Sequence, residues 1–483
     1  MENPETDNAL SWAVAYYANS LMDYLSRTQP AIADSLKVEG VKGKMAEAVW
    51  KLKDLQLADG SWSWYKGMSG SLYMTTAITQ LMARLNKMTG GELDAEVVKM
   101  NQQAWVYLNN RLAEEVKWMK EAEKKGENHF EPSEMALQCL YTDALEKNQR
   151  MTADVRKYLV GKLEKMSGQL TIYGKALSAI VLKEAGKEAK AKKFLESLMQ
   201  YSVMTEEMGR YFDTPKAEYS WFSYRIPTQV AAIEVVKYIA NEEKTQEEMK
   251  RWLLKQKQAQ AWDTPIATAD AVYALLMTGK NGLQQTGAAT IKVGKQVIRT
   301  PDDALGYVRQ EVTGNVLNIR KVTVEKESAG IAWGAVYAEF LEDMDQVTAQ
   351  GHALEISRTL YREGKPLPVG TTLKVGDKLT VRLTLKADRD MGFVQVKDTR
   401  AAFMEPVDAL SGYCWNRTLA SYRENKDAST SFFIERLRKG THELEYEVYV
   451  TSSGKYTQGI PTVQSVYAPE FVGHGESGKW IIE

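Results

Sequence analysis

The hydrophobic period of this 483-residue chain changes near residue 285, and that change limits the possible folds more than any other feature. Before it, apolar residues recur at three- and four-residue spacing in "ALSWAVAYYANSLMDYL" and "AAIEVVKYIA", which is typical of amphipathic helices. After it, "LKVGDKLTVRLTLKA" and "HELEYEVYVTS" alternate with a period of two, which is typical of strands with one buried face. The sequence therefore predicts a helical region followed by antiparallel β-structure.

A tryptophan-containing turn recurs along the helical region. The stretch "DGSWSWYKG" stands ahead of a helix-like run, and the order of aromatic turn, threonine and helix returns twice, with a weaker copy in "SGQLTIYGKALSAIVL". The clear copies contain Trp62, Trp64, Trp221 and Trp262. Such recurrence indicates tandem helical hairpins. We expect an α/α toroid, in which inner and outer helices alternate around a barrel.

Each turn is followed by a threonine, at Thr76, Thr228 and Thr268. We expect these threonines to be helix N-caps that accept a hydrogen bond from a free backbone N–H. The tryptophans could line a sugar-binding loop or a cofactor shelf, or they could be structural. Because the pattern recurs at the ends of successive hairpins, the structural interpretation is favoured, with the rings buried between neighbouring hairpins.

The "Q-x-x-D-G-S-W" turn at Gln56 to Trp62 resembles the turn motif of terpenoid cyclases and other toroid proteins. That resemblance keeps an alternative open, namely a toroid enzyme or small-ligand binder. A cyclase needs an acidic cluster, and the helical region shows only isolated acids such as Asp59, Asp213, Asp263 and Asp270. We predict no catalytic residues, no bound cofactor and no metal site.

Composition narrows the classes of partner. The 62 basic and 63 acidic residues give a net charge of −1, so nothing favours nucleic acid or an anionic membrane as a partner. Cys139 and Cys414 lie far apart and make neither a disulfide framework nor a zinc site. No apolar run reaches the roughly 20 residues of a membrane span. The start "MENPETDNALSW" has no signal-peptide pattern, so we expect either a cytosolic protein or a chain cut from a longer one.

The second half carries several motifs in a fixed order: "VGD" before a strand, "VQVKD" after it, "RENKD" ahead of "SFFIERL", then "LRKGTHELEY" and the closing "YAPEFVGH". In this order they resemble the C-terminal macroglobulin-like domain of bacterial α2-macroglobulins. The resemblance implies three domains: a thioester-domain-like toroid in residues 1–285, a CUB-like β-sandwich in 286–369, and a macroglobulin-like, receptor-binding-type β-sandwich in 370–483.

The resemblance also implies a function. Proteins of this family trap proteases: a bait region is cleaved, the molecule closes around the attacker, and a thioester between Cys and Gln in "C-x-E-Q" captures it covalently. Here the corresponding position near the first helix reads "ETDN", at Glu5, Thr6, Asp7 and Asn8, and no cysteine precedes Cys139. We therefore expect a non-enzymatic endopeptidase trap that acts by steric entrapment without a thioester.

The implied partners are proteases and upstream macroglobulin domains of the same chain, and the implied location of the parent protein is a bacterial periplasm or cell envelope. Some relatives pass the acyl group through a histidine. The helical region has His129 alone, in the polar loop "GENHFEPS", and we expect it at the surface.

Overall fold

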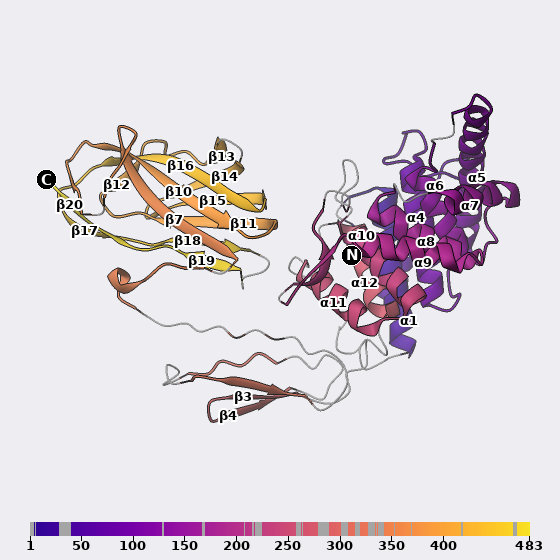
Figure 1. Cartoon of the computed structure of the whole chain (residues 1–483), viewed down its shortest axis with the longest axis horizontal. Coiled ribbons are helices and arrows are strands. Elements are labelled where there is room, and N and C mark those ends of the chain that lie inside the picture. Colours follow the sequence, from indigo (N-terminus) through magenta and orange to yellow (C-terminus); the bar gives the residue numbers. More distant parts are fainter. Residues whose placement is uncertain are drawn as a thin grey trace. The chain divides into compact units, whose positions relative to one another are not determined.

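The chain folds into two compact units, Met1–Ala332 and Trp333–Glu483, in the computed structural model (Figure 1). The structure describes residues 4, 6–28, 40–127, 130–166, 170–206, 208–214, 217, 225–256, 262, 264–278, 289–300, 308–313, 319–326, 334, 336, 342–351, 353–368, 370–416, 419–466 and 471–483. Glu5, His129 and Trp221 lie outside these residues.

The first unit is built mainly from helices. Its described elements include eleven α-helices: α1 (Ala9–Thr28), α3 (Val41–Leu55), α4 (Leu72–Met88), α5 (Ala95–Lys124), α6 (Glu134–Leu145), α7 (Ala153–Lys165), α8 (Ile172–Glu184), α9 (Glu188–Met199), α10 (Arg225–Val235), α11 (Glu243–Lys255) and α12 (Pro265–Thr278). A π-helical turn, Val236–Ala240, extends α10, and the strands β1 (Ser202–Thr205) and β2 (Gly209–Phe212) form a hairpin.

Six of these helices form a closed inner ring. In order, α1, α4, α6, α8, α10 and α12 each pack against the next, and α12 packs back against α1. The remaining helices lie outside the ring: α3 covers α1, α5 covers α4, α9 covers α8, α11 covers α10, and α7 contacts α5 and α8. Inner and outer helices therefore alternate along the chain, which is the arrangement of an α/α toroid.

The difference between inner and outer helices follows from their residues. In the inner helix α8, every residue from Ile172 to Leu182 is buried. In the outer helix α9, the buried positions are Ala191, Phe194, Leu195 and Leu198, a stripe of helical period, and the lysines between them face solvent. A helix that is buried on all sides lies inside a bundle, whereas an amphipathic helix lies on the outside of the bundle with its apolar face inward.

A three-stranded sheet of order β4-β3-β5 follows the ring, formed by β3 (Thr290–Val293), β4 (Gln296–Arg299) and β5 (Val322–Glu325). After it come β6 (Gln350–Gly351), β7 (Leu354–Arg362), β8 (Lys365–Pro366), β9 (Thr372–Leu373), β10 (Lys378–Ala387), β11 (Met391–Thr399), β12 (Met404–Pro406), β13 (Gly412–Asn416), β14 (Leu419–Lys426), β15 (Ser429–Leu437), β16 (Gly440–Val450), β17 (Gly454–Gln458), β18 (Pro461–Ser465), β19 (Val472–His474) and β20 (Gly478–Ile482).

The second unit is a β-sandwich. One sheet has the order β12-β16-β10-β7-β8 and the other β13-β14-β15-β11-β18-β19-β6, and a short sheet β17-β20-β9 lies beside them. Along β10 the side chains alternate between buried and less buried positions, with Leu383 paired to Leu444 of β16. Between the two large sheets, the rings of Phe432 and Tyr446 lie 6.1 Å apart. The period-two pattern therefore forms the core of this unit.

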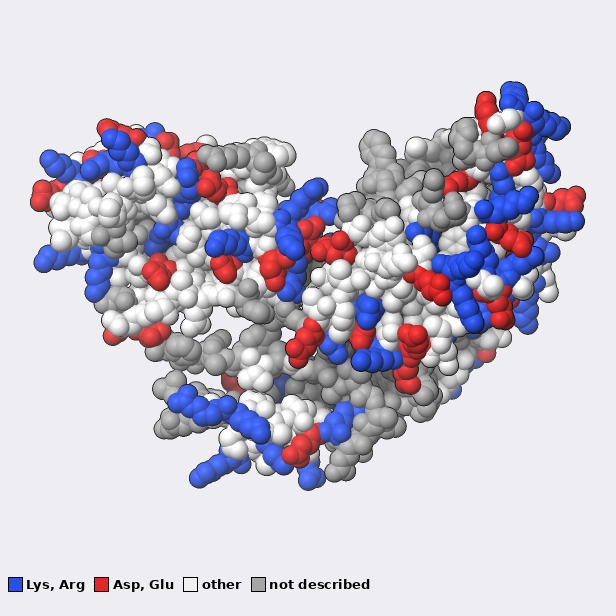
Figure 2. All heavy atoms as spheres, in the orientation of Figure 1, with Lys and Arg blue, Asp and Glu red and all other residues white. Residues whose placement is uncertain are grey.

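The predicted fold class, an α/α toroid followed by antiparallel β-structure, is confirmed. The domain boundaries at 285 and 369 stay predictions. Figure 2 shows basic and acidic side chains interspersed over both units on the face drawn, without a single-sign patch that would favour nucleic acid. Among the described residues, no helix is long and apolar enough to cross a membrane.

Candidate functional site

The segment before α1 is the first candidate site, because the thioester motif of the α2-macroglobulins is expected there. Asn8 acts as a helix cap: its Oδ1 accepts a hydrogen bond from the Ser11 backbone N–H at 2.9 Å, and its Nδ2 donates to Thr6 Oγ1 at 2.9 Å. Asp7 Oδ1 accepts from the Trp12 indole N–H at 2.6 Å, which together with Lys51 lowers the pKa of Asp7. These side chains close the start of a helix.

The two cysteines lie far from this segment along the chain. Cys139 is buried in α6, with its sulfur 3.8 Å from Thr76 Oγ1, and burial raises the pKa of the thiol to about 12. Its neighbour Gln138 donates its amide N–H to the Tyr173 hydroxyl at 3.2 Å. Because adjacent residues of a helix point in different directions, Gln138 is not placed to acylate Cys139. Cys414 belongs to β13 in the second unit.

Two of the tryptophan turns share one pattern of hydrogen bonds. The backbone N–H of Trp62 donates to Thr75 Oγ1 at 3.0 Å, and its indole N–H donates to the Leu52 carbonyl at 3.0 Å. Trp262 repeats both contacts with Thr268 at 3.1 Å and with the Leu253 carbonyl at 2.8 Å. Both rings are buried, and each indole N–H is bonded to the end of the preceding outer helix. The turns therefore tie outer helices to inner ones.

Two further residues complete the first turn. Trp64 is half-buried and stacks on Tyr73, with ring centroids 5.6 Å apart and planes 8° apart. Gly60 has a φ of 88°, and a Cβ added there would lie 2.1 Å from the Gln103 carbonyl oxygen. Only glycine fits this position, which explains the Asp-Gly of the motif.

The expected role of the threonines was wrong: Thr76, Thr228 and Thr268 all lie inside their helices rather than at the N-caps. The N-caps are residues further upstream: Ser71 caps α4 by accepting from the Met74 N–H, and Thr264 accepts from the Ala267 N–H at the start of α12. Thr268 lies one turn inside its helix, where its hydroxyl accepts from the tryptophan N–H and donates to the Thr264 carbonyl. The threonine therefore fixes the turn to the helix.

A buried ionic cluster lies inside the helical ring and is defined here as the Arg84 cluster: Arg84, Tyr141, Glu234, Asp270 and Tyr273. The Arg84 guanidinium donates to Asp270 Oδ1 at 2.5 Å and to the Tyr141 hydroxyl at 3.2 Å. Both tyrosine hydroxyls donate to Glu234, Tyr141 at 2.5 Å and Tyr273 at 2.8 Å. The cluster joins α4, α6, α10 and α12, so it links four of the six inner helices.

Burial away from water shifts the pKa values of Arg84 and Asp270 in the Arg84 cluster. Burial disfavours the charged guanidinium, yet Tyr141, Asp270 and Glu234 around it hold the pKa of Arg84 well above its usual range. Burial raises the pKa of Asp270, and the adjacent Arg84 opposes that shift. Both carboxylates accept hydrogen bonds from side chains of the ring itself, Asp270 from Arg84 and Glu234 from the two tyrosines. The cluster is suited to clamping helices rather than to acid catalysis.

Sequence reasoning missed this cluster. Asp270 was expected to be an isolated acid, and it is instead paired with Arg84. The available signal was a single arginine inside the apolar run "TTAITQLMARL", since a charge on the buried side of a helix needs a partner. The partner itself could not be found from spacing, because Asp270 lies 186 residues further along.

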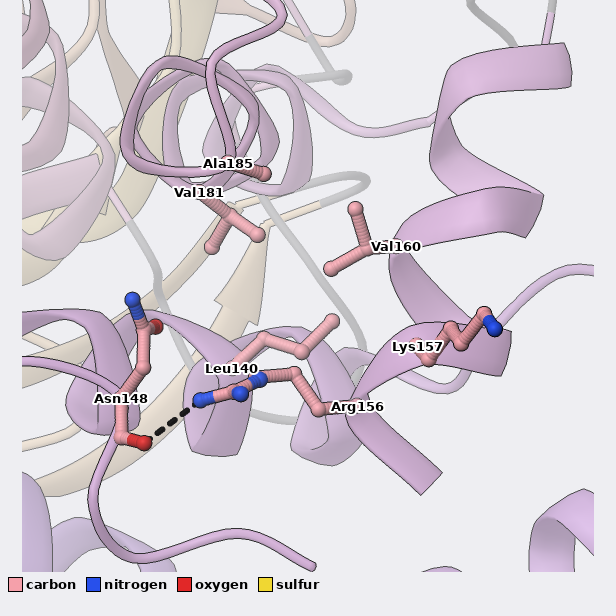
Figure 3. A pocket seen from close by; sticks show the side chains of 7 residues that line it. All are labelled: Leu140, Asn148, Arg156, Lys157, Val160, Val181 and Ala185. Carbon is pink, nitrogen blue, oxygen red and sulfur yellow. Dashed lines mark hydrogen bonds between the residues drawn. The ribbon is translucent and has the colours of Figure 1, made fainter. Parts of the chain in front are cut away.

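A cavity of about 210 Å³ lies between α6, α7 and α8. Figure 3 shows the aliphatic side chains of Leu140, Val160 and Val181 around it, and the Arg156 guanidinium donating to the Asn148 carbonyl at 2.5 Å. None of the residues lining this cavity is a carboxylate, so its chemistry favours contact with apolar groups over acid–base catalysis.

One family model matches the chain. The model of the Bacterial Alpha-2-macroglobulin MG10 domain matches residues 354–470, which hold most of the β-sandwich. No curated protein matches the chain.

Several solved structures are similar at low identity. Salmonella alpha-2-macroglobulin reacted with methylamine is 14% identical with a TM-score of 0.39, and the match covers 99% of this chain and 30% of that one. Native Escherichia coli alpha-2-macroglobulin from domain MG7 to the C-terminus is 12% identical with a TM-score of 0.39, over 100% of this chain and 74% of that one. The trypsin-activated Escherichia coli protein is 11% identical with a TM-score of 0.43, over 98% and 31%.

The chain thus spans less than a third of the length of the Salmonella protein. The resemblance inferred from the sequence motifs is confirmed by the family model over residues 354–470, which match the bacterial alpha-2-macroglobulin MG10 domain.

Proposed function

We propose that this chain is the C-terminal part of a bacterial α2-macroglobulin-like endopeptidase trap that holds proteases by steric enclosure and forms no thioester. The observation that carries the proposal is the segment Thr6–Asn8, whose side chains are engaged in closing the start of α1. A thioester needs a thiolate and a glutamine carbonyl carbon in contact. Cys139, the first cysteine of the chain, is instead buried beside Thr76.

In this proposal the chain is not an enzyme. The bait region belongs to preceding macroglobulin domains of the parent protein, in the periplasm or cell envelope, and the protease is the partner of the parent. The helical ring and the β-sandwich form part of the enclosure. The Arg84 cluster keeps the ring closed while the surrounding domains move.

The alternative of a cyclase-like toroid enzyme has less support. A cyclase must present a proton or a cation-stabilising carboxylate to its substrate in an open barrel. In the Arg84 cluster, the Asp270 and Glu234 carboxylates accept hydrogen bonds from Arg84, Tyr141 and Tyr273. Their oxygens are therefore used within the barrel wall.

The test uses the parent protein, incubated with trypsin and assayed with a small peptide substrate and a large protein substrate. Steric enclosure predicts that cleavage of the large substrate is lost while cleavage of the small substrate is retained. Denaturing electrophoresis should then release free trypsin, because no covalent bond holds it. The matched control is Cys139→Ser in the parent, which should trap trypsin as the parent does.

A second measurement is the mass of the chain after treatment with methylamine, which opens thioesters. The mass of the chain should be unchanged by methylamine. A trypsin adduct that survives denaturation and disappears in Cys139→Ser would show covalent capture and refute the proposal. Retained cleavage of the large substrate by the trypsin-treated parent would refute trapping itself.

A further inference from the structure

The solvent face of the seven-stranded sheet carries a row of side chains that runs straight across the strands. Cross-strand pairing joins each member to the next, from β13 through β14, β15, β11 and β18 to β19: Tyr413, Tyr422, Phe433, Gln395, Gln464 and Val472. At its β13 end, the rings of Tyr413 and Tyr422 meet edge to face at 5.3 Å. The row is therefore a continuous surface that is aromatic at one end.

Five large aromatic side chains on this face are exposed to solvent. Tyr413 is 88% exposed and Trp415 is 77% exposed, while Tyr422, Phe433 and Phe393 are each exposed by more than a third. At about 200 Å² for a fully exposed aromatic side chain, these five rings expose on the order of 600 Å². An apolar patch of that size is at the upper limit for a monomer, and patches of this size are often interaction surfaces.

Phe393 contributes to this face at a conformational cost. Its φ is 52°, a left-handed conformation that a bulky residue rarely adopts. Its neighbour Val394 is buried, and Met391, two residues before Phe393, is also buried. Strict alternation from Met391 would bury Phe393 as well, so the left-handed residue directs an aromatic ring to the solvent side. Strain of this kind persists where the surrounding structure imposes it, often at binding surfaces.

β13 is also the edge of the sheet. In the part of the chain that the structure describes, β13 pairs with β14 on one side and with no strand on the other. Natural edge strands are protected by lysine, proline, bulges or extreme shortness. β13, Gly412–Asn416, has five residues and none of these devices, whereas β6 at the opposite edge has two residues, Gln350–Gly351.

We propose that a second copy of this chain pairs with β13 edge to edge, around a two-fold axis, to form a dimer with a continuous sheet. Facing residues of two antiparallel strands must point to the same side of a sheet, so only registers centred on a residue are possible. The register centred on Cys414 pairs all five residues of β13. It sets Tyr413 opposite Trp415 of the second copy, twice, and aromatic pairs of this kind stabilise sheets.

The charge pattern does not oppose this pairing, because β13 contains no charged residue. The register places the two copies of Cys414 opposite each other, with Cα atoms about 4.5–5.5 Å apart, as facing residues of antiparallel strands are. That separation lies within the range that a disulfide spans. The proposed dimer therefore predicts its own crosslink.

The test uses the full 483-residue chain. Sedimentation velocity from about 1 to 200 μM covers the affinities expected for a small aromatic interface, and the weight-average mass should rise from monomer to dimer. Trp415→Lys and Tyr413→Lys should each raise the dissociation constant of the dimer at least about tenfold, because each introduces a positive charge into β13 of both copies, where the two strands pair. The matched control is Trp50→Lys, an exposed tryptophan of α3, which should dimerise like the parent sequence.

Oxidation by copper–phenanthroline and dioxygen, which takes one electron from each of two thiols, should give a crosslinked dimer joined through Cys414. Cys414→Ser should abolish the crosslink and leave the dimer mass unchanged, since Cys139 is buried. A chain that stays monomeric throughout the concentration range would overturn the proposal. So would a dimer that survives Trp415→Lys unchanged or forms no Cys414 crosslink, since either outcome would place the contact elsewhere.

Discussion

Arg84 and Asp270 lie 186 residues apart in the chain, yet the guanidinium of one donates to the carboxylate of the other at 2.5 Å inside the helical ring. The pair joins α4 to α12, and Glu234 is linked to it through the tyrosine hydroxyls. Because all of these groups are buried, each charge depends on the others for its stabilisation.

Replacing Arg84 by Met should therefore destabilise the first unit by about 3 to 5 kcal/mol, since it leaves buried carboxylates without their cation. The free energy of unfolding can be followed in urea by tryptophan fluorescence. The matched control is Arg27→Met, whose partner Glu92 is exposed; it should change the free energy of unfolding far less than Arg84→Met does. A loss below 1 kcal/mol for Arg84→Met would contradict the role of the cluster as a clamp.

Trp262→Ala should cost about 3 to 5 kcal/mol, because it removes a buried ring and the hydrogen bond that its indole N–H donates to the Leu253 carbonyl. Trp62→Ala should cost a similar amount, because the two tryptophans share the same contacts. Trp50→Ala, at an exposed position, serves as the control and should change stability by no more than about 0.5 kcal/mol. If Trp262→Ala were harmless and altered the binding of a small ligand, the turns would be binding sites.

The two thiols should differ strongly in reactivity. Burial raises the pKa of Cys139 to about 12, so at pH 8 it carries almost no thiolate, and the helical ring covers it. Ellman's reagent should modify one thiol of the native protein within minutes and the second only after denaturation. Peptide mapping should place the fast reaction at Cys414. Fast modification of Cys139 would show that the ring opens readily.

Glu134 should make stability depend on pH. Burial raises its pKa from 4.5 to about 7, so the folded state binds a proton that the unfolded state has lost between these values. The contribution of this group is therefore most favourable below pH 4.5 and is lost as pH rises through 7. At pH 8 the buried charge costs up to about 3 kcal/mol.

Glu134→Gln should consequently stabilise the protein at pH 8 and have little effect at pH 4.5, as measured by the urea midpoint at each pH. Glu114→Gln, at an exposed position of α5, is the control and should show no such difference. Equal effects of Glu134→Gln at both pH values would mean that the carboxyl titrates normally.

The sequence predicted the features that rest on local patterns. Helical period and the recurring tryptophan turns indicated the toroid, and strict alternation in β10 and β16 indicated the sandwich. The role of the threonines was mistaken because a cap and a first-turn position differ by four residues, which pattern alone does not resolve: Thr264 caps α12, and Thr268 lies one turn further on.

The candidate sites were less predictable because they depend on how the helices pack in the ring and on how the strands pair in the sheet. Arg84 approaches Glu234 and Asp270 only after α10 and α12 have been placed in the ring, and no spacing rule reports that contact. In the same way, the aromatic face becomes visible only once the register pairs Tyr413 with Tyr422 and Tyr422 with Phe433. Arg84 within its apolar run indicated that a partner was needed, but the sequence identified neither that partner nor the aromatic face.

The contact of α12 with α1 has a consequence for biosynthesis. Tyr17 donates to the Ala269 carbonyl, 252 residues later, so the flank of α1 that faces α12 has no partner when it leaves the ribosome. At roughly 5 to 20 residues per second, that flank waits on the order of 10 to 50 seconds. During this interval the nascent ring is an open arc with an apolar end, because it cannot close before its last helix has arrived.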